Sequence, residues 1–149
     1  MENSKILIET MKHSDLKKIK ENLESDFDDF WDITTIQEEL NCSNSIYIVS
    51  KYQEEILGFA GIKVILDEAE LMNIVTRKNS RNLGIASLML EYIIDLCKKR
   101  KIKRINLEVN TKNSIAINLY KKYNFKEVGL RKKYYNNTED AILFSRDII

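Results

Sequence analysis

The chain has 149 residues, 44% of them hydrophobic, with 24 basic and 23 acidic side chains and a formal net charge of +1 at pH 7. This length can bury one hydrophobic core but is short for two ordinary domains, so we expect a single domain over residues 1–149. The balanced charge does not predict general binding to nucleic acid or membranes, and any polyanion would have to bind locally. No apolar run approaches the roughly 20 residues that cross a bilayer, and no signal-peptide pattern is evident, so we expect a cytoplasmic protein.

Few residues are suited to metal binding or to nucleophilic catalysis. His13 is the only histidine and lies in a polar context, which argues against a zinc site or a Ser-His-Asp triad. Cys42 and Cys97 are far apart in sequence, and Cys97 falls in a helical apolar pattern, where cysteine packs as a small apolar residue. We therefore expect no metal and no disulfide.

The first half of the chain alternates short strand and helix patterns. Period-two alternation predicts strands, and apolar residues at helical spacing after Ser, Thr or Asp predict helices. In chain order, the sequence predicts a strand at 5–9, a helix starting at 14–15, an irregular acidic and aromatic segment at 26–31, a helix from 34 or 35 to 40, strands at 46–49 and 56–62 that form a hairpin turning near 53–54, a turn at 67–68, and a strand at 69–76.

A long helix dominates the second half. Apolar positions recur at helical spacing from Gly84 to Arg100, and the basic run 98–100 is expected to be a solvated helix terminus. The elements predicted after it are a strand at 105–109, a helix opened by Asn113 or Ser114, and strands at 125–130 and 141–144 joined through 134–137. Strand 69–76, the long helix and strand 105–109 form a parallel crossover unit. The whole pattern predicts an α/β fold with a mixed sheet covered by helices on both faces.

The segment before the long helix has the features of a phosphate-binding turn. The N–H groups of a first helical turn have no intrahelical partner, and the helix dipole adds positive charge there, so a pyrophosphate is the natural ligand. Gly84 has no Cβ to hold ligand oxygens away. Arg77, Lys78 and Arg81 add positive charge around it. The motif R-x-x-G-x-A by itself is equally typical of a glycine that only ends a loop and binds no phosphate.

Three features in this order resemble the GNAT N-acetyltransferases: R-x-x-G-x-A after a strand, then Leu107-Glu108-Val109, then Asn113 followed by Ala116-Ile117-Asn118-Leu119-Tyr120 and Phe125. The resemblance extends from about Ile62 onward. Leu66-Asp67-Glu68-Ala69 and Tyr134-Tyr135 are similar to the RimI-type ribosomal-protein alanine N-acetyltransferases. That group has a tryptophan near a proline on the substrate side, whereas here Trp31 has no proline nearby.

The resemblance implies a GNAT-like fold with a mostly antiparallel sheet, and acetyl transfer from acetyl-CoA to a protein N-terminal α-amine by direct attack. Neither cysteine is then a nucleophile. The implied acceptor is the N-terminal alanine of a small-subunit ribosomal protein. The implied contacts of acetyl-CoA are the backbone of Ile74, Val75 and Thr76 for the acetyl and pantetheine groups, the segment Arg81, Asn82, Leu83, Gly84, Ile85, Ala86 and Ser87 for the pyrophosphate, and Asn113.

The reaction needs a base, because an α-ammonium must lose a proton before it can attack. Glu108 lies on the polar side of the predicted strand and corresponds to the family's proposed base; the alternative is a solvated strand glutamate. Tyr120 corresponds to the acid that protonates the leaving thiolate, and its alternative is a core aromatic residue. Trp31, Tyr134 and Tyr135 are candidate substrate-binding residues, each with the alternative of a hydrophobic cover.

Three functions follow from this sequence. The first is acetylation of a protein N-terminus, the second is acetylation of a small amine such as a polyamine, and the third is a non-catalytic acyl-CoA-binding module. The presence of both Glu108 and Tyr120 argues against the third, because cofactor binding alone needs neither residue.

Overall fold

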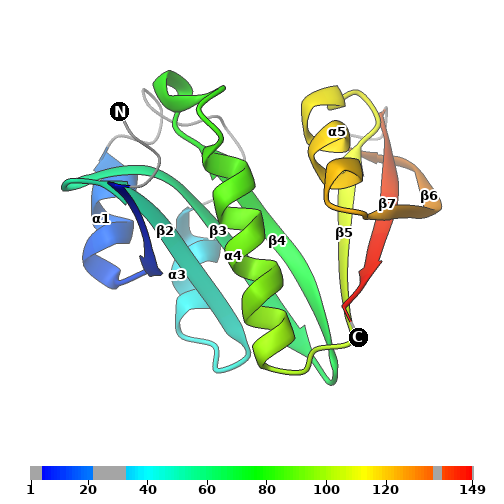
Figure 1. Cartoon of the computed structure of the whole chain (residues 1–149), viewed down its shortest axis with the longest axis horizontal. Helices are drawn as coiled ribbons and strands as arrows, with labels where there is room; N and C mark the ends of the chain where they lie inside the picture. Colours follow the sequence, from blue (N-terminus) through cyan, green and yellow to red (C-terminus); the bar gives the residue numbers. More distant parts are fainter. Residues whose placement is uncertain (1–4, 22–32, 136–138, 149) are drawn as a thin grey trace. The chain divides into compact units, whose positions relative to one another are not determined.

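The computed structural model of the chain describes residues 5–21, 33–135 and 139–148 (Figure 1). Its elements are β1 Ile6–Thr10, α1 His13–Glu21, α3 Ile33–Leu40, β2 Ser45–Tyr52, β3 Glu55–Ile65, β4 Glu68–Thr76, the 3-10 helix η2 Lys78–Ser80, α4 Ile85–Lys99, β5 Arg104–Asn110, α5 Ser114–Lys122, β6 Lys126–Tyr135 and β7 Glu139–Asp147. No described helix is both long enough and apolar enough to span a bilayer.

The strands pair in the order β1-β2-β3-β4-β5-β7-β6. β4 and β5 run parallel, whereas the pairs β1–β2, β2–β3, β5–β7 and β6–β7 are antiparallel. The predicted mixed, mostly antiparallel sheet is therefore confirmed. The chain forms two compact units, which we call the first unit (Met1–Lys63 with Met72–Asp95) and the second unit (Val64–Leu71 with Leu96–Ile149). The prediction of a single domain stays a prediction.

The first unit buries apolar side chains on both faces of its strands. One face carries Tyr47, Val49 and Phe59, which cluster with the buried residues of α1 and α3, namely Leu16, Ile19 and Ile36. α4 covers the other face so closely that a Cβ added to Gly58 would lie 2.9 Å from Met89 Cε. The predicted hairpin is present, and its turn includes Gln53 at φ 57°.

In the second unit, α5 covers one face of the strands. Residues of β5 alternate as predicted, with Ile105, Leu107 and Val109 buried and the residues between them partly exposed. Tyr120 of α5 packs against the rings of Phe125 and Phe144, with ring centroids 5.7 Å and 6.3 Å apart. The other face of β5 is therefore free for polar side chains.

Two local predictions were wrong. The turn between β3 and β4 is centred on Leu66 and Asp67 rather than on 67–68, because Leu66 adopts a left-handed conformation at φ 58° and Glu68 already belongs to β4. Tyr134 and Tyr135 end strand β6 rather than lying in the connection after it, and Tyr135 pairs with Glu139. The strong β propensity of tyrosine accounts for the longer strand.

Candidate active site

The predicted phosphate turn, residues 81–87, consists of a loop at 81–84 and the first three residues of α4. The first backbone hydrogen bond of that helix runs from the Leu88 N–H to the Gly84 carbonyl, at 3.0 Å. The N–H groups of Ile85, Ala86 and Ser87 therefore precede the first N–H that donates within the helix, and they have no intrahelical partner. Gly84 has φ 77°, a left-handed conformation in which an L side chain is strained. The turn thus presents main-chain donors at the positive end of a 15-residue helix.

The charges around the phosphate turn favour an anion. The first turn of α4 contains no acidic residue, and residues 81–84, which include Arg81, are exposed. Arg77 is anchored on β3, since its N–H donates to the Leu57 carbonyl at 2.7 Å and its Nη1 lies 3.6 Å from Glu55 Oε2. This donor set fits the diphosphate of coenzyme A, which needs main-chain N–H groups and local positive charge.

A buried polar pair lies beside the predicted acetyl-binding strand. Asn73 immediately precedes Ile74 in β4, and its amide donates to the Tyr47 hydroxyl at 3.1 Å, with both residues buried. The Tyr47 ring covers Gly61, where an added Cβ would lie 2.3 Å from ring atoms. Burial raises the pKa of Tyr47 to about 12. This pair is not predicted from the sequence, although an asparagine inside an apolar strand indicates that its amide hydrogen-bonds to another buried polar group.

Glu108 lies on the polar face of β5 in the second unit, as predicted. Its carboxylate is held by an ion pair in which Arg131 Nη2 of β6 lies 3.0 Å from Glu108 Oε1. The Glu108 side chain is 27% exposed, so it is neither fully buried nor fully solvated. Arg131 is not predicted from the sequence, because only the strand register, which pairs Arg131 with Ala141 and Ala141 with Asn110, brings it to this face.

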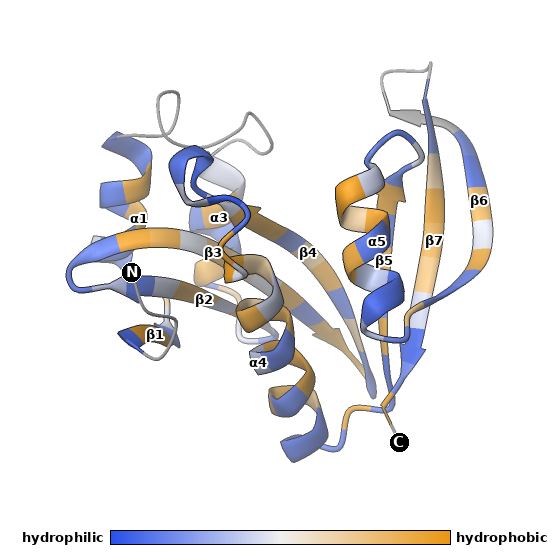
Figure 2. Ribbon diagram, turned by 45° about the horizontal axis from the view of Figure 1, so that its top comes forward, coloured by the Kyte–Doolittle hydropathy of each residue, from blue (hydrophilic) through white to orange (hydrophobic). Residues whose placement is uncertain are grey.

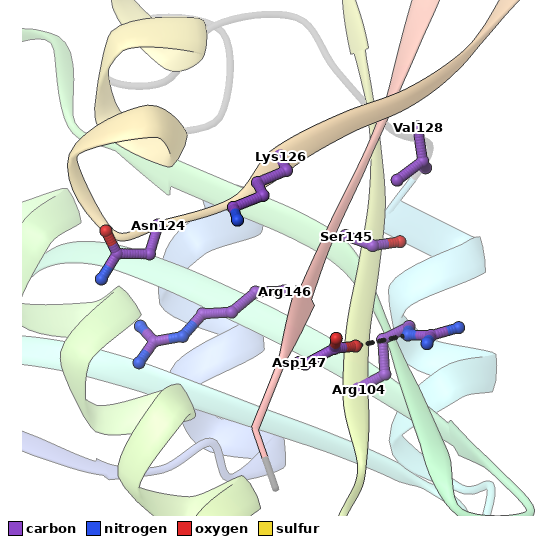
Figure 3. Close-up of a pocket in the computed structure, with 7 residues that line it drawn as sticks. All are labelled: Arg104, Asn124, Lys126, Val128, Ser145, Arg146 and Asp147. Carbon is purple, nitrogen blue, oxygen red and sulfur yellow. Dashed lines mark hydrogen bonds and ion pairs between the residues drawn. The ribbon is translucent and has the colours of Figure 1, made fainter.

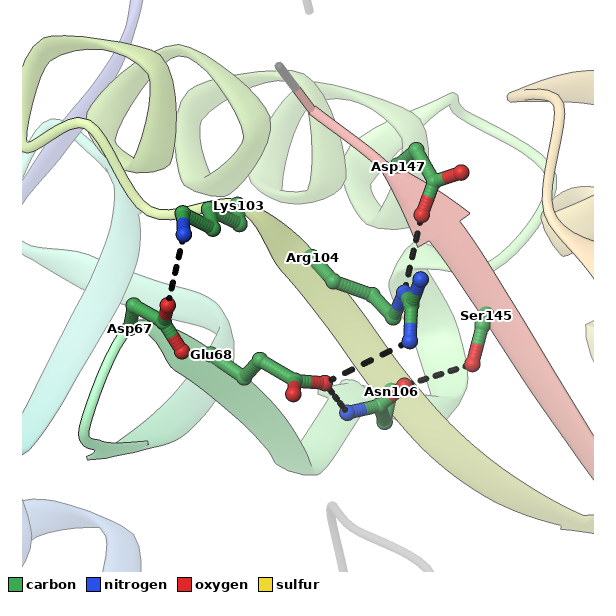
Figure 4. Close-up of polar contacts among 7 residues, drawn as sticks. All are labelled: Asp67, Glu68, Lys103, Arg104, Asn106, Ser145 and Asp147. Atoms are coloured by element: carbon green, nitrogen blue, oxygen red, sulfur yellow. Dashed lines mark hydrogen bonds and ion pairs between the residues drawn. The ribbon is translucent and has the colours of Figure 1, made fainter.

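Further polar residues continue this face toward β4 (Figure 4). Asn106 donates to Glu68 Oε1 at 2.9 Å and accepts a hydrogen bond from the Ser145 hydroxyl. Burial raises the pKa of Glu70, and the charges of Glu108 and Glu68 raise it further. Glu70 pairs in register with Asn106 across the parallel strands. The face therefore concentrates carboxylates, which favours a cationic or proton-donating ligand.

Two other predicted residues lie on α5. Asn113 is the N-cap of this helix, and its side-chain oxygen accepts from the Ala116 N–H at 3.2 Å. Tyr120 is 5% exposed and belongs to the aromatic cluster of the second unit. Both residues thus have structural tasks that are compatible with a second role.

The structure brings the predicted residues together in two groups. Ile74, Val75, Thr76 and residues 81–87 belong to the first unit, whereas Glu108, Asn113 and Tyr120 belong to the second. Tyr134 and Tyr135 lie at the end of β6 in the second unit. Trp31 lies outside the described residues.

The cysteines have no place in either group. Both are free thiols, and Cys97 is fully buried. Burial raises the pKa of the Cys97 thiol to about 11, so it is a poor nucleophile near neutral pH. Within 5–21, 33–135 and 139–148, no group of three or more His, Cys, Asp or Glu residues is arranged to hold a metal ion.

Comparison with known proteins identifies the family of this chain. The model of the acetyltransferase (GNAT) family matches residues 16–125. The chain therefore belongs to the GNAT acetyltransferase family, and the prediction of an N-acetyltransferase is confirmed.

Similar proteins indicate which branch of the family it resembles. A Bacillus subtilis (strain 168) protein provisionally named a [ribosomal protein bS18]-alanine N-acetyltransferase is 29% identical over 142 residues, which is 94% of each chain. The [ribosomal protein bS18]-alanine N-acetyltransferase of Escherichia coli (strain K12) is 38% identical over 94 residues, 61% of this chain and 64% of its own. The crystal structure of the Escherichia coli ribosomal-protein-S18-alanine N-acetyltransferase superposes with a TM-score of 0.88 at 27% identity, covering 96% of this chain and 94% of that one. The RimI-type resemblance is thereby confirmed.

Proposed function

We propose that this protein transfers an acetyl group from acetyl-CoA to the α-amine of an N-terminal alanine, and that its acceptor is the ribosomal protein bS18. The observation that carries the proposal is Glu108, a half-buried glutamate at the family's base position whose carboxylate is oriented by Arg131 at 3.0 Å. The likeness to two bS18-alanine N-acetyltransferases supports the choice of acceptor. A ribosomal protein is made in the cytoplasm, so the proposal places the enzyme there.

The phosphate turn, residues 81–87, would hold the diphosphate of acetyl-CoA. Its donors are the N–H groups of Ile85, Ala86 and Ser87, and Gly84 leaves the approach to them open. The backbone of Ile74, Val75 and Thr76 would receive the pantetheine arm and the acetyl group, and Asn113 would add a polar contact. Acetyl-CoA supplies the acetyl group as a thioester that an amine attacks directly.

Glu108 would accept the proton of the α-ammonium, directly or through one water. Arg131 fixes one carboxylate oxygen, Oε1, which leaves the other oxygen available to the amine. The neighbouring carboxylates Glu68 and Glu70 attract the cationic N-terminus to the same face. The ion pair with Arg131 and the neighbouring carboxylates favour a role as base for Glu108 over that of a solvated strand glutamate.

Tyr120 would donate a proton to the departing thiolate. Its ring is fixed by Phe125 and Phe144, so its hydroxyl is held in one place. Tyr134 and Tyr135, at the end of β6, and Trp31 would line the acceptor groove. We also propose that the two units act as one acetyltransferase domain, because the family model spans parts of both.

The proposal is tested by release of free thiol from acetyl-CoA in the presence of the full-length protein. Three acceptors are compared: a peptide that begins with alanine, the same peptide already acetylated at its N-terminus, and spermidine. We expect thiol release and a mass increase only with the free alanine peptide. Transfer to spermidine alone would establish the small-amine function instead, and coenzyme A binding without transfer to any acceptor would indicate a binding module.

A further inference from the structure

The turn between α4 and β5 is strongly basic. Six of the seven residues from 98 to 104 are cationic: Lys98, Lys99, Arg100, Lys101, Lys103 and Arg104. The first four are exposed, and no ion pair to them is found among the described residues. Figure 2 shows the hydrophilic C-terminal end of α4 that begins this run. The balanced net charge of the whole chain thus conceals a local excess of positive charge.

A solvated helix terminus does not account for this number of charges. The negative end of a helix dipole is equivalent to about half an elementary charge, which offsets only part of one cation. Two nearby acidic residues form ion pairs with the last two cations of the run (Figure 4). Lys103 Nζ lies 3.1 Å from Asp67 Oδ2, and Arg104 Nε lies 2.8 Å from Asp147 Oδ1. The charges of residues 98–101 are therefore not offset by an ion pair within the described part of the chain.

Two surface hollows adjoin this run in the second unit. The first, of about 480 Å³, is lined by Arg100 and Lys101 with Asp67 and the apolar residues Val64, Leu66 and Ile102. The second, of about 500 Å³, is lined by Arg104, Asn124, Lys126, Val128, Ser145, Arg146 and Asp147 (Figure 3). Arg146 is oriented there by its hydrogen bond to the Tyr123 carbonyl, at 2.9 Å.

Both hollows lie at the end of β5 where that strand begins. Arg104 opens β5, whereas Glu108 lies four residues along it, about 13 Å away at 3.3 Å per residue. A ligand bound in the two hollows could therefore leave the polar face around Glu108 open. Contacts on such a surface position a partner without taking part in catalysis.

We propose that this basic surface, defined by Lys98, Lys99, Arg100, Lys101, Lys126 and Arg146, binds the phosphate backbone of RNA. These lysines and arginines gather at the end of the second unit where β5 begins and β7 ends, and such a cluster is the electrostatic footprint of a nucleic-acid site. A membrane is a poorer occupant, because the exposed apolar residues nearby, Ile65, Leu66 and Val128, lie on strands and a turn and do not form the apolar face of an amphipathic helix. The choice of RNA rests on the proposed function, because an enzyme that acts on a ribosomal protein encounters its acceptor close to ribosomal RNA.

The test measures binding of a fluorescent RNA duplex of arbitrary sequence by anisotropy at several salt concentrations. In the test variant Lys98, Lys99 and Lys101 are replaced by Gln; in the matched control the exposed α1 residues Lys17, Lys18 and Lys20 are replaced by Gln, with the same change in net charge. The slope of log K against log salt is negative, and each lost phosphate contact reduces its magnitude by about 0.7–0.9. We expect the negative slope of the test variant to become shallower by about 2–3 and its binding at about 0.1 M salt to weaken about 100-fold. The control should bind like the unmodified protein.

Two outcomes would overturn the proposal: equal RNA binding by both variants, or binding of the unmodified protein to anionic vesicles and not to RNA. The Leu66→Ser variant sharpens the second arm, because a membrane contact needs this side chain and a phosphate contact does not. Acetylation of the short alanine peptide is measured on every variant. Loss of RNA binding with full peptide acetylation separates this proposal from the catalytic one.

Discussion

The phosphate turn of the first unit and the polar face of β5 in the second unit are built from different parts of the polypeptide. The turn uses main-chain N–H groups at the start of α4, so many side chains could replace its own as long as Gly84 keeps φ 77°. The face depends on one carboxylate, Glu108, and on the arginine 3.0 Å from it. Substitutions should therefore affect the two regions differently: graded losses of affinity in the turn, and losses of turnover on the face.

The largest effect is expected for Glu108→Gln, which keeps the size of the side chain but removes the base. Turnover should fall by about 10²–10⁴-fold at neutral pH, while the affinity for acetyl-CoA stays unchanged. The loss should be partly relieved at high pH, because the α-amine then deprotonates in solution with a pKa near 8. Steady-state kinetics from neutral to alkaline pH measure both effects. Glu127→Gln, at an exposed glutamate of β6, is the matched control, and equal turnover of the two variants would remove Glu108 from the base role.

Tyr120→Phe should have the next largest effect, a fall in turnover of about 10²-fold, at the low end for a proton donor. The ring and its contacts with Phe125 and Phe144 remain, so the midpoint of thermal unfolding should hardly move. Single-turnover kinetics and a thermal melt are measured side by side, with Tyr92→Phe on the exposed surface of α4 as the control. Full turnover would make Tyr120 a core residue only.

The positions of the phosphate turn and of Glu108 could be predicted from the sequence, because local patterns determine both. Gly84 before a long apolar helix indicated the turn, and the alternation of Ile105, Leu107 and Val109 placed Glu108 on the opposite, polar face. The partners of these residues could not be predicted in this way. Arg131 reaches Glu108 only through the register of β6 and β7, which long-range pairing sets.

The same reason explains the other omissions. The hydrogen bond between Asn73 and Tyr47 joins residues 26 positions apart, and the two hollows of the basic surface gather residues from several strands. Tyr134 and Tyr135 are predicted in the connection, whereas their β propensity continues strand β6.

A smaller effect is expected for Gly84→Ala in the phosphate turn. A Cβ at φ 77° costs about 1–2 kcal/mol, so the affinity for coenzyme A should fall about 5–30-fold. Turnover at saturating acetyl-CoA should change little, because the chemistry lies elsewhere. Isothermal titration with coenzyme A measures the affinity, and Gly129→Ala in β6 is the control glycine. A Gly84→Ala variant with unchanged affinity but poor turnover would contradict the division of tasks between the two regions.

The smallest effect is expected for Tyr47→Phe, which tests whether the first unit depends on the buried pair beside β4. Removing the hydroxyl that accepts from Asn73 at 3.1 Å should lower the free energy of unfolding at neutral pH by about 1 kcal/mol, with turnover unchanged. The raised pKa of Tyr47, about 12, adds a pH signature. A phenol whose pKa is higher in the folded state contributes stability that is complete below its unfolded pKa near 10 and is lost as pH rises toward 12. Urea unfolding across this range should therefore show a flatter alkaline decline for Tyr47→Phe than for the unmodified protein or the control Tyr52→Phe at the end of β2. Parallel declines in all three proteins would show that the Tyr47 hydroxyl ionises as readily in the folded state as in the unfolded chain.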